Sequence, residues 1–526
     1  MKMKRKILYF IAANLLVLFM ISSGCTKDFE EINTDNNAPL IEKSAPDMLL
    51  TNAIESMTDR VHEIFLGHEM GSCWVQHMAK VQYTDEDKYV PRMTVINNTW
   101  NSFYAASGFD VQTIYNLAEK SGNDSYKAIA LILKSYITSV LTDEFGDVPY
   151  SEAWQGSAEE PILDPVFDTQ ESIYAALIDN LKTANELLTS AAPAIKGDIL
   201  FNGDLMKWKK FANSLRLRLL LRRSDRVNPT NEMTAIFGDP QTYPILSGNS
   251  DNVALQYLGS APNNNPINEN RKTRDDHRVS KTLVDYLYTE APSPDYRIVV
   301  FAELAPGPGD WVGLPNGLLT ADAAVYNGNG ISNTSKIGTY FSKATAPGML
   351  LSYTEVLFIK AEAAARGFIP GGHTVADKAY KDAIRASWDQ FNADGSFTSS
   401  LEVWRSTFES WGMTTENIYD YAWQDFVDYG GTADTLLPAT AVEQIATQKW
   451  VALFDQGLQA NFEWKRTGFP VLIPAVAGQN QGKIPVRAYY PSDEAGTNPK
   501  NLADAVTHQG KDDLNTRVWW DTKDNF

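Results

Sequence analysis

The sequence predicts a mainly α-helical protein, built as a tetratricopeptide-like scaffold of helical hairpins that carries long irregular loops. Three observations support this fold class. Apolar residues recur at helical spacing in several separate blocks. Paired blocks lie about 35–45 residues apart, as in tetratricopeptide-like repeats, although the strict consensus is absent. Two long stretches between the blocks are too rich in loop-forming or aromatic residues to continue the helices.

The first helical block is expected to contain three helices. The clearest spans 124–145, where apolar side chains follow the helical period. These side chains are Ile129, Ile132, Leu133, Tyr136, Ile137, Val140 and Leu141. A second helix should begin at Asp168, because an N-cap residue with Glu171 three positions later is typical of a capping box. A third should start at Leu205 and end before Asn228-Pro229.

Helical spacing returns in the second half of the chain, where we expect helices over 349–365, 375–388 and 441–464. Four tryptophans lie on the helical periodicity and are therefore expected in the core. They are Trp208, Trp388, Trp450 and Trp464.

Two loop-rich insertions interrupt the helical blocks. The first spans about 226–348 and is rich in Gly, Pro and Asn, so no helix of normal length is expected there. The second spans about 393–438 and crowds together aromatic residues, namely Trp404, Trp411, Tyr419, Tyr421 and Trp423. The tryptophans among them could equally fill a loop core. Long loops on a rigid scaffold usually carry function, so both insertions are candidate ligand-binding regions.

Composition and charge limit the classes of function that the chain can have. The chain has 526 residues, of which 44% are apolar, so it can bury a large core and is not disordered as a whole. Its formal net charge is −19. A phosphate backbone and an anionic membrane surface both repel such a body. No nucleic-acid partner is expected.

Residues 1–24 have the layout of a secretory signal. Four basic residues precede an apolar run from Ile7 to Ile21, and small residues follow. The run is 15 residues long, shorter than the ~20 that a membrane-spanning helix needs. The alternative interpretation is a membrane anchor helix. Removing the four positive charges of this segment takes the net charge from −19 to −23.

The residues after the apolar run resemble a bacterial lipobox, with the pattern Ile21-Ser22-Ser23-Gly24-Cys25. In that class the cysteine is acylated, by palmitate among other chains, and becomes the first mature residue. Several acyl chains anchor a protein far better than one. Residues 25–40 are then a flexible lipidated tether, whose acidic cluster resembles a surface-export signal of Gram-negative lipoproteins, and residues 41–526 form a single domain. Cys73 has no internal disulfide partner and is expected to be a small buried residue.

Four segments resemble one family in order and spacing. They are Leu141 to Ala153 (LTDEFGDVPYSEA), Ser352 to Ala363 (SYTEVLFIKAEA), Ile445 to Pro470 with its KWVALF and EWKRTGFP motifs, and Ile484 to Glu494 (IPVRAYYPSDE). With the lipobox and the DFEEIN opening at Asp28, they cover nearly the whole chain. The sequence is therefore similar to SusD/RagB-like outer-membrane nutrient-binding lipoproteins, in particular the SusD-like branch.

This resemblance implies a fold and a role. The fold is a tetratricopeptide-like scaffold whose loops form the ligand face. The role is that of a lipid-anchored protein on the exterior of the outer membrane. Such a protein binds a nutrient, usually an oligosaccharide, and delivers it to a TonB-dependent, SusC-like transporter. The resemblance does not identify the substrate, because the ligand loops vary within the family.

Saccharide binding needs flat apolar faces for the C–H side of the ring and amides or carboxylates for the hydroxyls. Three loop segments, at 82–89, 310–317 and 325–329, combine these groups, and the loop at 263–266 is rich in amides. The ligand-binding candidates are Tyr83, Asp85, Tyr89, Asn264, Trp311, Asn316 and Tyr326. For each aromatic residue among them, packing within the core or a loop is the alternative role.

Charged residues on helices have simpler explanations. The basic stripe of Arg216, Arg218, Arg222 and Arg223 predicts a solvated face or internal ion pairs, with a partner contact as the alternative. Arg487 and Glu494 are expected to form a structural pair.

The sequence favours a binding protein over an enzyme, with no cofactor and no metal. His62 and His68 are six residues apart, which turns them ~240° around a helix onto different faces. No P-loop or nucleophile elbow is present. Three alternatives stay open: a surface glycoside hydrolase, whose carboxylate pair a count of acids does not exclude, a purely structural transporter lid, and a peptide-binding RagB-type lid.

Overall fold

The computed structural model describes residues 45–156, 160–189, 191–291, 294–410, 418–429 and 435–524. The chain divides into two units, Met1–Ala45 and Pro46–Phe526, and the fold below is that of the second unit. The predicted signal sequence, Cys25, the tether and Trp411 lie outside the described residues.

Helical hairpins form the body of this unit. The first group comprises α3 (Pro46–His62), α4 (Met93–Asn101), α5 (Gly108–Ser121), α6 (Asp124–Phe145), α7 (Gln170–Leu187) and α8 (Leu205–Arg222). The second group comprises α15 (Tyr353–Ala365), α16 (Gly372–Phe391), α20 (Ala441–Ala452) and α21 (Gly457–Thr467). Two further helices, α22 (Glu494–Thr497) and α23 (Pro499–Gln509), follow near the C-terminus.

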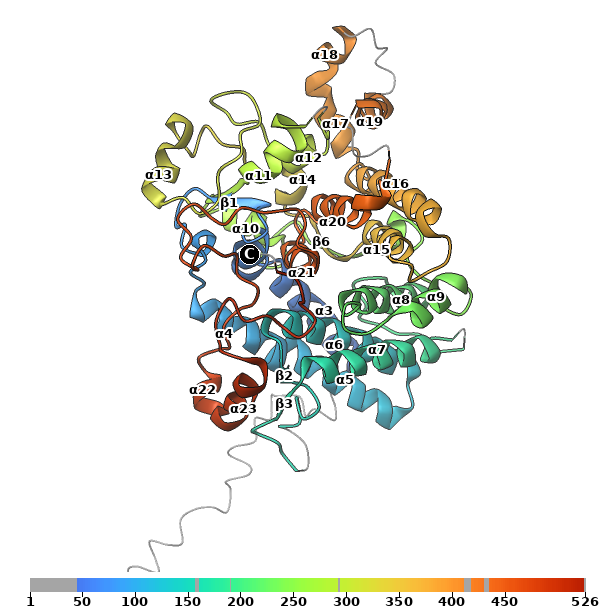
Figure 1. Cartoon of the computed structure of the whole chain (residues 1–526). Helices are drawn as coiled ribbons and strands as arrows, with labels where there is room; N and C mark the ends of the chain where they lie inside the picture. Colours follow the sequence, from blue (N-terminus) through green and yellow to red (C-terminus); the bar gives the residue numbers. More distant parts are fainter. Residues whose placement is uncertain are drawn as a thin grey trace, which may run out of the picture. The chain divides into compact units, whose positions relative to one another are not determined.

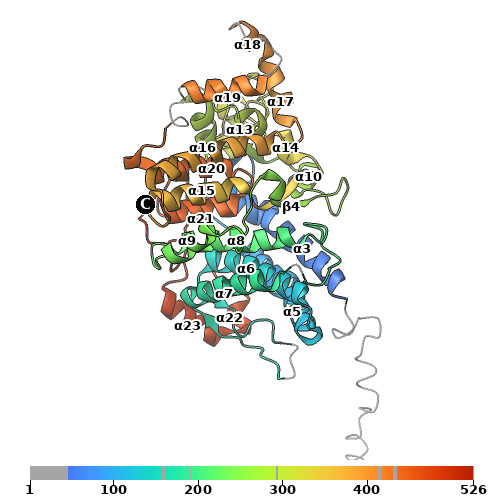
Figure 2. The ribbon, with the colours of Figure 1, turned by 90° about the vertical axis from the view of Figure 1, so that its right-hand side faces the viewer.

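Neighbouring helices pack in hairpins: α5 on α6, α6 on α7 and α7 on α8, then α15 on both α16 and α20. Figure 2 shows these helices stacked in layers, and α8 joins the two groups because it contacts both α7 and α15. This arrangement confirms the predicted fold class, a mainly helical hairpin scaffold.

Helix boundaries test the periodicity argument. Helix α6 has the predicted bounds, with the Asn123 side chain as N-cap and Gly146 at φ 88° just after its end. The capping box predicted at Asp168 is wrong. Thr169 is the N-cap of α7 and accepts a hydrogen bond from the backbone N–H of Ser172, whereas the Asp168 carboxylate accepts one from the backbone N–H of Tyr150 at 3.0 Å.

Two later predictions merge separate elements. The helix predicted over 349–365 begins as strand β6 (Pro347–Leu351), and α15 starts only after Ser352, its N-cap. The helix predicted over 441–464 is two helices, interrupted at Asp455 with φ 71°. Gly457 then lets α21 approach the π-helix η2 (Ile64–Ser72), because a Cβ there would lie 2.3 Å from a backbone oxygen of η2.

Three antiparallel two-stranded ribbons tie loops to the scaffold. They are β1 (Met78–Lys80) with β5 (His277–Val279), β2 (Val148–Pro149) with β3 (Phe167–Asp168), and β4 (Val253–Gln256) with β6. Among the residues of the first insertion that the structure describes, the α-helices are all short, as predicted. They are α9 (Thr230–Gly238), α10 (Pro266–Arg271), α11 (Lys281–Val284), α12 (Ile298–Phe301), α13 (Thr320–Val325) and α14 (Thr339–Ser342).

The second insertion is more helical than predicted. It contains α17 (Ser396–Leu401), α18 (Arg405–Ser410) and a regular 12-residue helix, α19 (Ile418–Tyr429). Side chains of α19 pack on the α16 tryptophan Trp388, among them Trp423 at 5.2 Å and Phe426 at 5.3 Å between ring centroids. The aromatic crowding therefore marks the buried face of a helix rather than a bare loop.

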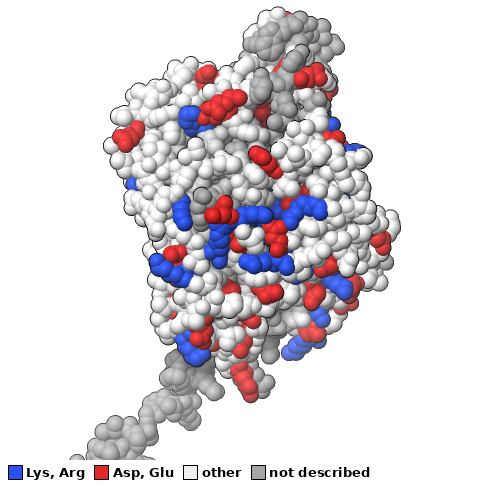
Figure 3. Space-filling model, viewed as in Figure 1, with Lys and Arg blue, Asp and Glu red and all other residues white. Residues whose placement is uncertain are grey.

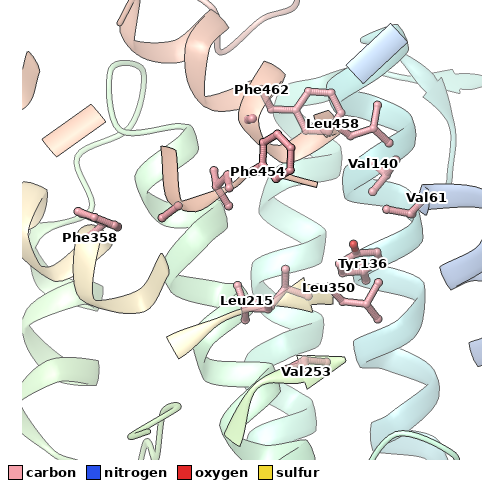
Figure 4. Close-up of a cluster of buried hydrophobic side chains, with 14 of the residues drawn as sticks. Val61, Tyr136, Val140, Leu215, Val253, Leu350, Phe358, Phe454, Leu458 and Phe462 are labelled. Atoms are coloured by element: carbon pink, nitrogen blue, oxygen red, sulfur yellow. The ribbon is translucent and has the colours of Figure 1, made fainter. Parts of the chain in front are cut away.

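The core lies between the two helical groups. Figure 4 shows part of it, where Tyr136 of α6 and Leu215 of α8 lie beside Leu350 of β6, and Val140 of α6 lies beside Val61 of α3. The four tryptophans predicted for the core are each at most 2% exposed, and Cys73 is 1% exposed, so those predictions are confirmed.

The arginines of α8 make internal ion pairs. Arg218 donates to Glu355 of α15 at 2.6 Å, and both side chains are fully buried. Arg222 pairs with Asp143 of α6 and, at 3.0 Å, with Glu463 of α21. The ion-pair interpretation of the basic stripe is thus confirmed, and these pairs join four helices that are distant in sequence.

The expected pair of Arg487 with Glu494 is wrong. Arg487 instead pairs with Asp512 at 2.9 Å, and Glu494 accepts a hydrogen bond from the indole N–H of Trp100 at 3.1 Å. Each partner comes from a segment whose approach depends on the tertiary fold.

Within the described residues, no helix combines the length and the apolar character that crossing a membrane requires. The face in Figure 3 carries basic and acidic side chains close together in a band across its middle.

Candidate functional site

The two loop-rich insertions meet at a hollow of about 490 Å³, which we call the Trp311 hollow. Its walls come from α12 and the following loop, from α14, and from the start of α17. Figure 1 shows these three helices together near the top of the molecule, and α12 contacts both α14 and α17. The volume lies within the ~300–1,000 Å³ typical of small-molecule sites.

Trp311 forms an aromatic wall of this hollow. Its ring stacks on Trp404 of the second insertion with 5.3 Å between centroids and an interplanar angle of 2°. Tyr288 contacts it edge-on at 5.1 Å. The indole N–H donates to the carbonyl of Ala302 at 3.1 Å. Only 5% of Trp311 is exposed, so its orientation is set by packing before any ligand arrives.

Polar groups line the remainder of the Trp311 hollow. Hydroxyls come from Thr339, Ser396, Ser399 and Ser400, and a carboxylate comes from Glu303. These groups are partly or fully exposed, so they can exchange water for a ligand. Hydroxyl and carboxylate groups around an aromatic wall are the combination that saccharide recognition requires.

A second hollow of about 410 Å³ adjoins the first, and we call it the amide hollow. Four side-chain amides line it, together with a small apolar floor that includes Pro347 and Met349. The amides are those of Asn249, Asn252, Gln256 and Gln390. Asn249 donates to the carbonyl of Ala386 at 2.9 Å, while its own side-chain oxygen has no hydrogen-bond partner.

Three residues are common to both hollows: Tyr340, Lys343 and Asp394. Lys343 and Asp394 form an ion pair that joins the two insertions, and the Lys343 ammonium lies 5.2 Å from the Tyr340 ring centroid. Although burial opposes it, hydrogen bonds from Lys343 and from Ser396 lower the pKa of Asp394 to about 2. This carboxylate is therefore ionised at every physiological pH.

The sequence-predicted residues do not gather in one place. Trp311 alone among them lines the Trp311 hollow. Asn264 lines a different, acidic hollow of about 470 Å³ beside α3. Tyr83 is 63% exposed beneath the guanidinium of Arg274, and Asp85 is exposed and paired with Lys88 at 2.9 Å. Tyr326 is half-buried against a small apolar cluster.

Tyr89 and Asn316 do not reach the surface. Tyr89 is 3% exposed, and its hydroxyl accepts a hydrogen bond from the backbone N–H of Ala475 at 2.8 Å. Asn316 is 7% exposed and donates to Asp87 and to the carbonyl of Met78, each at 2.7 Å. Both polar groups are occupied by the protein, so these residues hold loops in place.

Sequence reasoning did not identify Tyr340, Lys343, Asp394 or Ser399. The signal that could have found the last two is the polar stretch from Asn392 to Ser400, which contains Gly395 and opens the second insertion. No local signal marks Tyr340, because its position depends on how α14 meets α16 through Phe391.

No group of three or more potential metal ligands comes together within the described residues. His62 and His68 are buried, and burial lowers their pKa values to about 4 and about 3. Glycoside hydrolysis needs a carboxyl group with a raised pKa as general acid. In the Trp311 hollow, the pKa of Asp394 is lowered instead of raised. The other carboxylate there, Glu303, pairs with Arg271 at 3.4 Å.

Solved structures resemble the chain along most of its length. A chitin-binding protein has 27% sequence identity and a TM-score of 0.75, covering 91% of this chain and 100% of that chain. A SusD homologue from Bacteroides fragilis NCTC 9343 has 24% identity and a TM-score of 0.73, with the same coverage. A chitin-binding SusD homologue from Flavobacterium johnsoniae has 23% identity and a TM-score of 0.70, again over 91% and 100%. The latter two similarities support the fold.

Among curated proteins, none matches the sequence. A family model does: the SusD-like model described as "starch-binding associating with outer membrane" matches residues 36–491. Helical hairpins, loop-borne hollows and a family match over most of the sequence agree, and the chain belongs to the SusD-like family.

Proposed function

We propose that this protein is a lipid-anchored, surface-exposed lipoprotein of the outer membrane that binds an oligosaccharide and delivers it to a SusC-like, TonB-dependent transporter. The family description, which joins starch binding with the outer membrane, supports the class of ligand and the location. The lipobox at Cys25 supports the anchor.

One observation carries the binding proposal: the Trp311 hollow lies where the two insertions meet, and it combines an aromatic wall with hydroxyl and carboxylate groups. A sugar ring would pack its C–H face on the apolar wall and exchange hydroxyl hydrogen bonds with the serines and Glu303. Each such contact contributes only about 0.5–1.5 kcal/mol, so affinity must come from several contacts on one chain.

The first saccharides to test come from the comparison. The relative at 27% identity is a chitin-binding protein, so chito-oligosaccharides stand first and malto-oligosaccharides second, the latter because the family description names starch. The proposed role includes no chemistry: the ligand is bound and released intact.

Titration calorimetry with chitobiose, chitohexaose and maltohexaose tests the binding proposal. Ser399 is exposed on α17 and lines the Trp311 hollow, so Ser399→Trp should fill the hollow and reduce affinity at least about tenfold, the loss of one or two contacts. Ser121→Trp, at the exposed end of α5, is the matched control and should bind as the wild type does.

Equal saccharide affinity of Ser399→Trp and Ser121→Trp would contradict the assignment of the Trp311 hollow as the binding site. Binding of peptides but not of saccharides would favour a RagB-type lid. Release of new reducing ends by the pure protein would favour the glycosidase alternative. Delivery needs a separate test. The native protein, purified from outer membranes in mild detergent, should co-purify with a barrel transporter. Recovery of the protein without a transporter would count against delivery.

A further inference from the structure

The amide hollow is not needed for the proposed binding site, yet it shares a wall with that site. Three of its amides already donate within the protein: Asn249 to the carbonyl of Ala386, Asn252 to Gln390, and Gln256 to the carbonyl of Thr345. A primary amide carries two N–H donors, so one remains on each, and the buried side-chain oxygen of Asn249 is an acceptor without a donor. Its floor is apolar, with Ala254, Pro347 and Met349. The hollow can therefore take a second residue of a saccharide chain, in particular one that carries an acetamido group, whose amide and methyl match this lining.

The shared wall separates the two hollows. It consists of the Lys343–Asp394 ion pair, one partner from each insertion, with Tyr340 beside it. The two side chains are 35% and 39% exposed, and an ion pair this open contributes little free energy. Long flexible Lys343 can swing away without disturbing the buried Phe341 that anchors α14.

We propose that the two hollows are neighbouring subsites of one saccharide groove, and that the Lys343–Asp394 pair is a partition that a chain long enough to occupy both must displace. Short saccharides bind on one side and leave the pair closed. Longer chains open it and gain the amide contacts. The pair then sets the chain-length preference of the protein. This inference rests on the proposed function, because it assumes that the Trp311 hollow binds saccharide.

Chain-length dependence is the readout. Affinities for chitobiose and chitohexaose are measured for the wild type, Lys343→Met and Lys500→Met. Lys343→Met keeps an apolar stem but removes the pair, so the ratio of chitohexaose affinity to chitobiose affinity should rise about threefold to fivefold. Lys500→Met removes an exposed pair on α23, with Asp504 at 3.0 Å, and should change neither affinity.

A second variant closes the amide hollow instead of opening it. Ala393 is exposed and lines only that hollow, so Ala393→Trp should cancel the advantage of chitohexaose over chitobiose and leave chitobiose binding intact. Melting temperatures of all variants check folding. Salt offers a further check, because ~1 M NaCl screens the exposed ion pair. The wild-type ratio of chitohexaose affinity to chitobiose affinity should then rise toward the ratio of Lys343→Met.

The outcomes separate this inference from the proposed function. If the wild type binds neither saccharide nor maltohexaose, the proposed function fails. If it binds saccharide and Lys343→Met keeps the wild-type length profile, only the partition is overturned. Equal loss of affinity for both lengths in Lys343→Met would make Lys343 a direct ligand contact and would overturn the partition as well.

Discussion

Trp311 lines a ligand-sized hollow although only 5% of it is exposed. The same side chain therefore packs against Trp404 and also forms a wall of that hollow. The sequence criterion of aromatic plus amide residues on broken backbone selects Trp311, which lines the hollow, and also Tyr89 and Asn316, which are buried. Whether a loop residue points inward depends on tertiary hydrogen bonds, such as those to Asp87 and Ala475, that no local pattern encodes.

The burial of Trp311 leads to a stability prediction. Trp311→Ala should lower the free energy of unfolding by about 3 kcal/mol as well as weaken saccharide binding, because it removes a buried ring and its stack. Trp311→Phe keeps part of the aromatic wall and should therefore lose less stability and less saccharide affinity than Trp311→Ala. Urea unfolding and calorimetry measure the two effects. Unchanged unfolding of Trp311→Ala would show that the stack with Trp404 contributes nothing to stability.

Long helices are the elements that the sequence predicts best, because helical periodicity is local. Helix α6 has its predicted bounds. Errors occur where tertiary pairing overrides the local pattern. Residues at 349–351 pair with β4 instead of joining α15, and Asp455 breaks one predicted helix into α20 and α21. The sequence does not predict helix α19, because crowded aromatic residues are also typical of packed loops.

The contact between α8 and α15 depends on Arg218 and Glu355. Arg218→Met should destabilise the protein by about 3 kcal/mol, because it leaves a buried carboxylate with only Lys449, 3.7 Å away. Lys378→Met, which removes an exposed pair with Asp382, should leave the free energy of unfolding close to that of the wild type. Chemical denaturation at pH 7 compares the two variants.

The same pair predicts a pH dependence. Although burial opposes it, Arg218 and Lys449 lower the pKa of Glu355 in the folded state. A carboxyl with a lowered folded pKa stabilises the fold above its unfolded pKa, about 4.3, and loses that contribution as the pH falls. The deficit of Arg218→Met should therefore be largest at pH 7 and shrink below about pH 4. A deficit independent of pH would mean that lost packing, not lost charge pairing, causes it.

At the scale of the whole molecule, the family resemblance predicts more of the structure than the residue patterns do. The motifs of the chain predicted a SusD-like protein, and the fold and the family model agree. The site could not be placed in the same way, because its lining combines the two insertions, which are joined only through the folded scaffold. The lipid anchor stays a prediction from the residues around Cys25.

Membrane attachment through Cys25 can be tested in cells. Cys25→Ala should abolish labelling by radioactive palmitate and prevent the mature protein from fractionating with the outer membrane, because no acyl chain can be attached. Cys73→Ala is the matched control, since this buried thiol lies in the core and should not affect anchoring. Palmitate labelling of Cys25→Ala at the wild-type level would contradict the lipobox assignment.

The lining of both hollows comes almost entirely from the two insertions and the segments beside them, with Gln390 of α16 as the contribution of a long helix. The arginine pairs and the tryptophan core lie elsewhere, in the hairpins. The lining of the hollows and the buried contacts that stabilise the fold thus come from separate parts of the chain. Loop segments around the hollows can therefore change in evolution while the helical hairpins continue to fold.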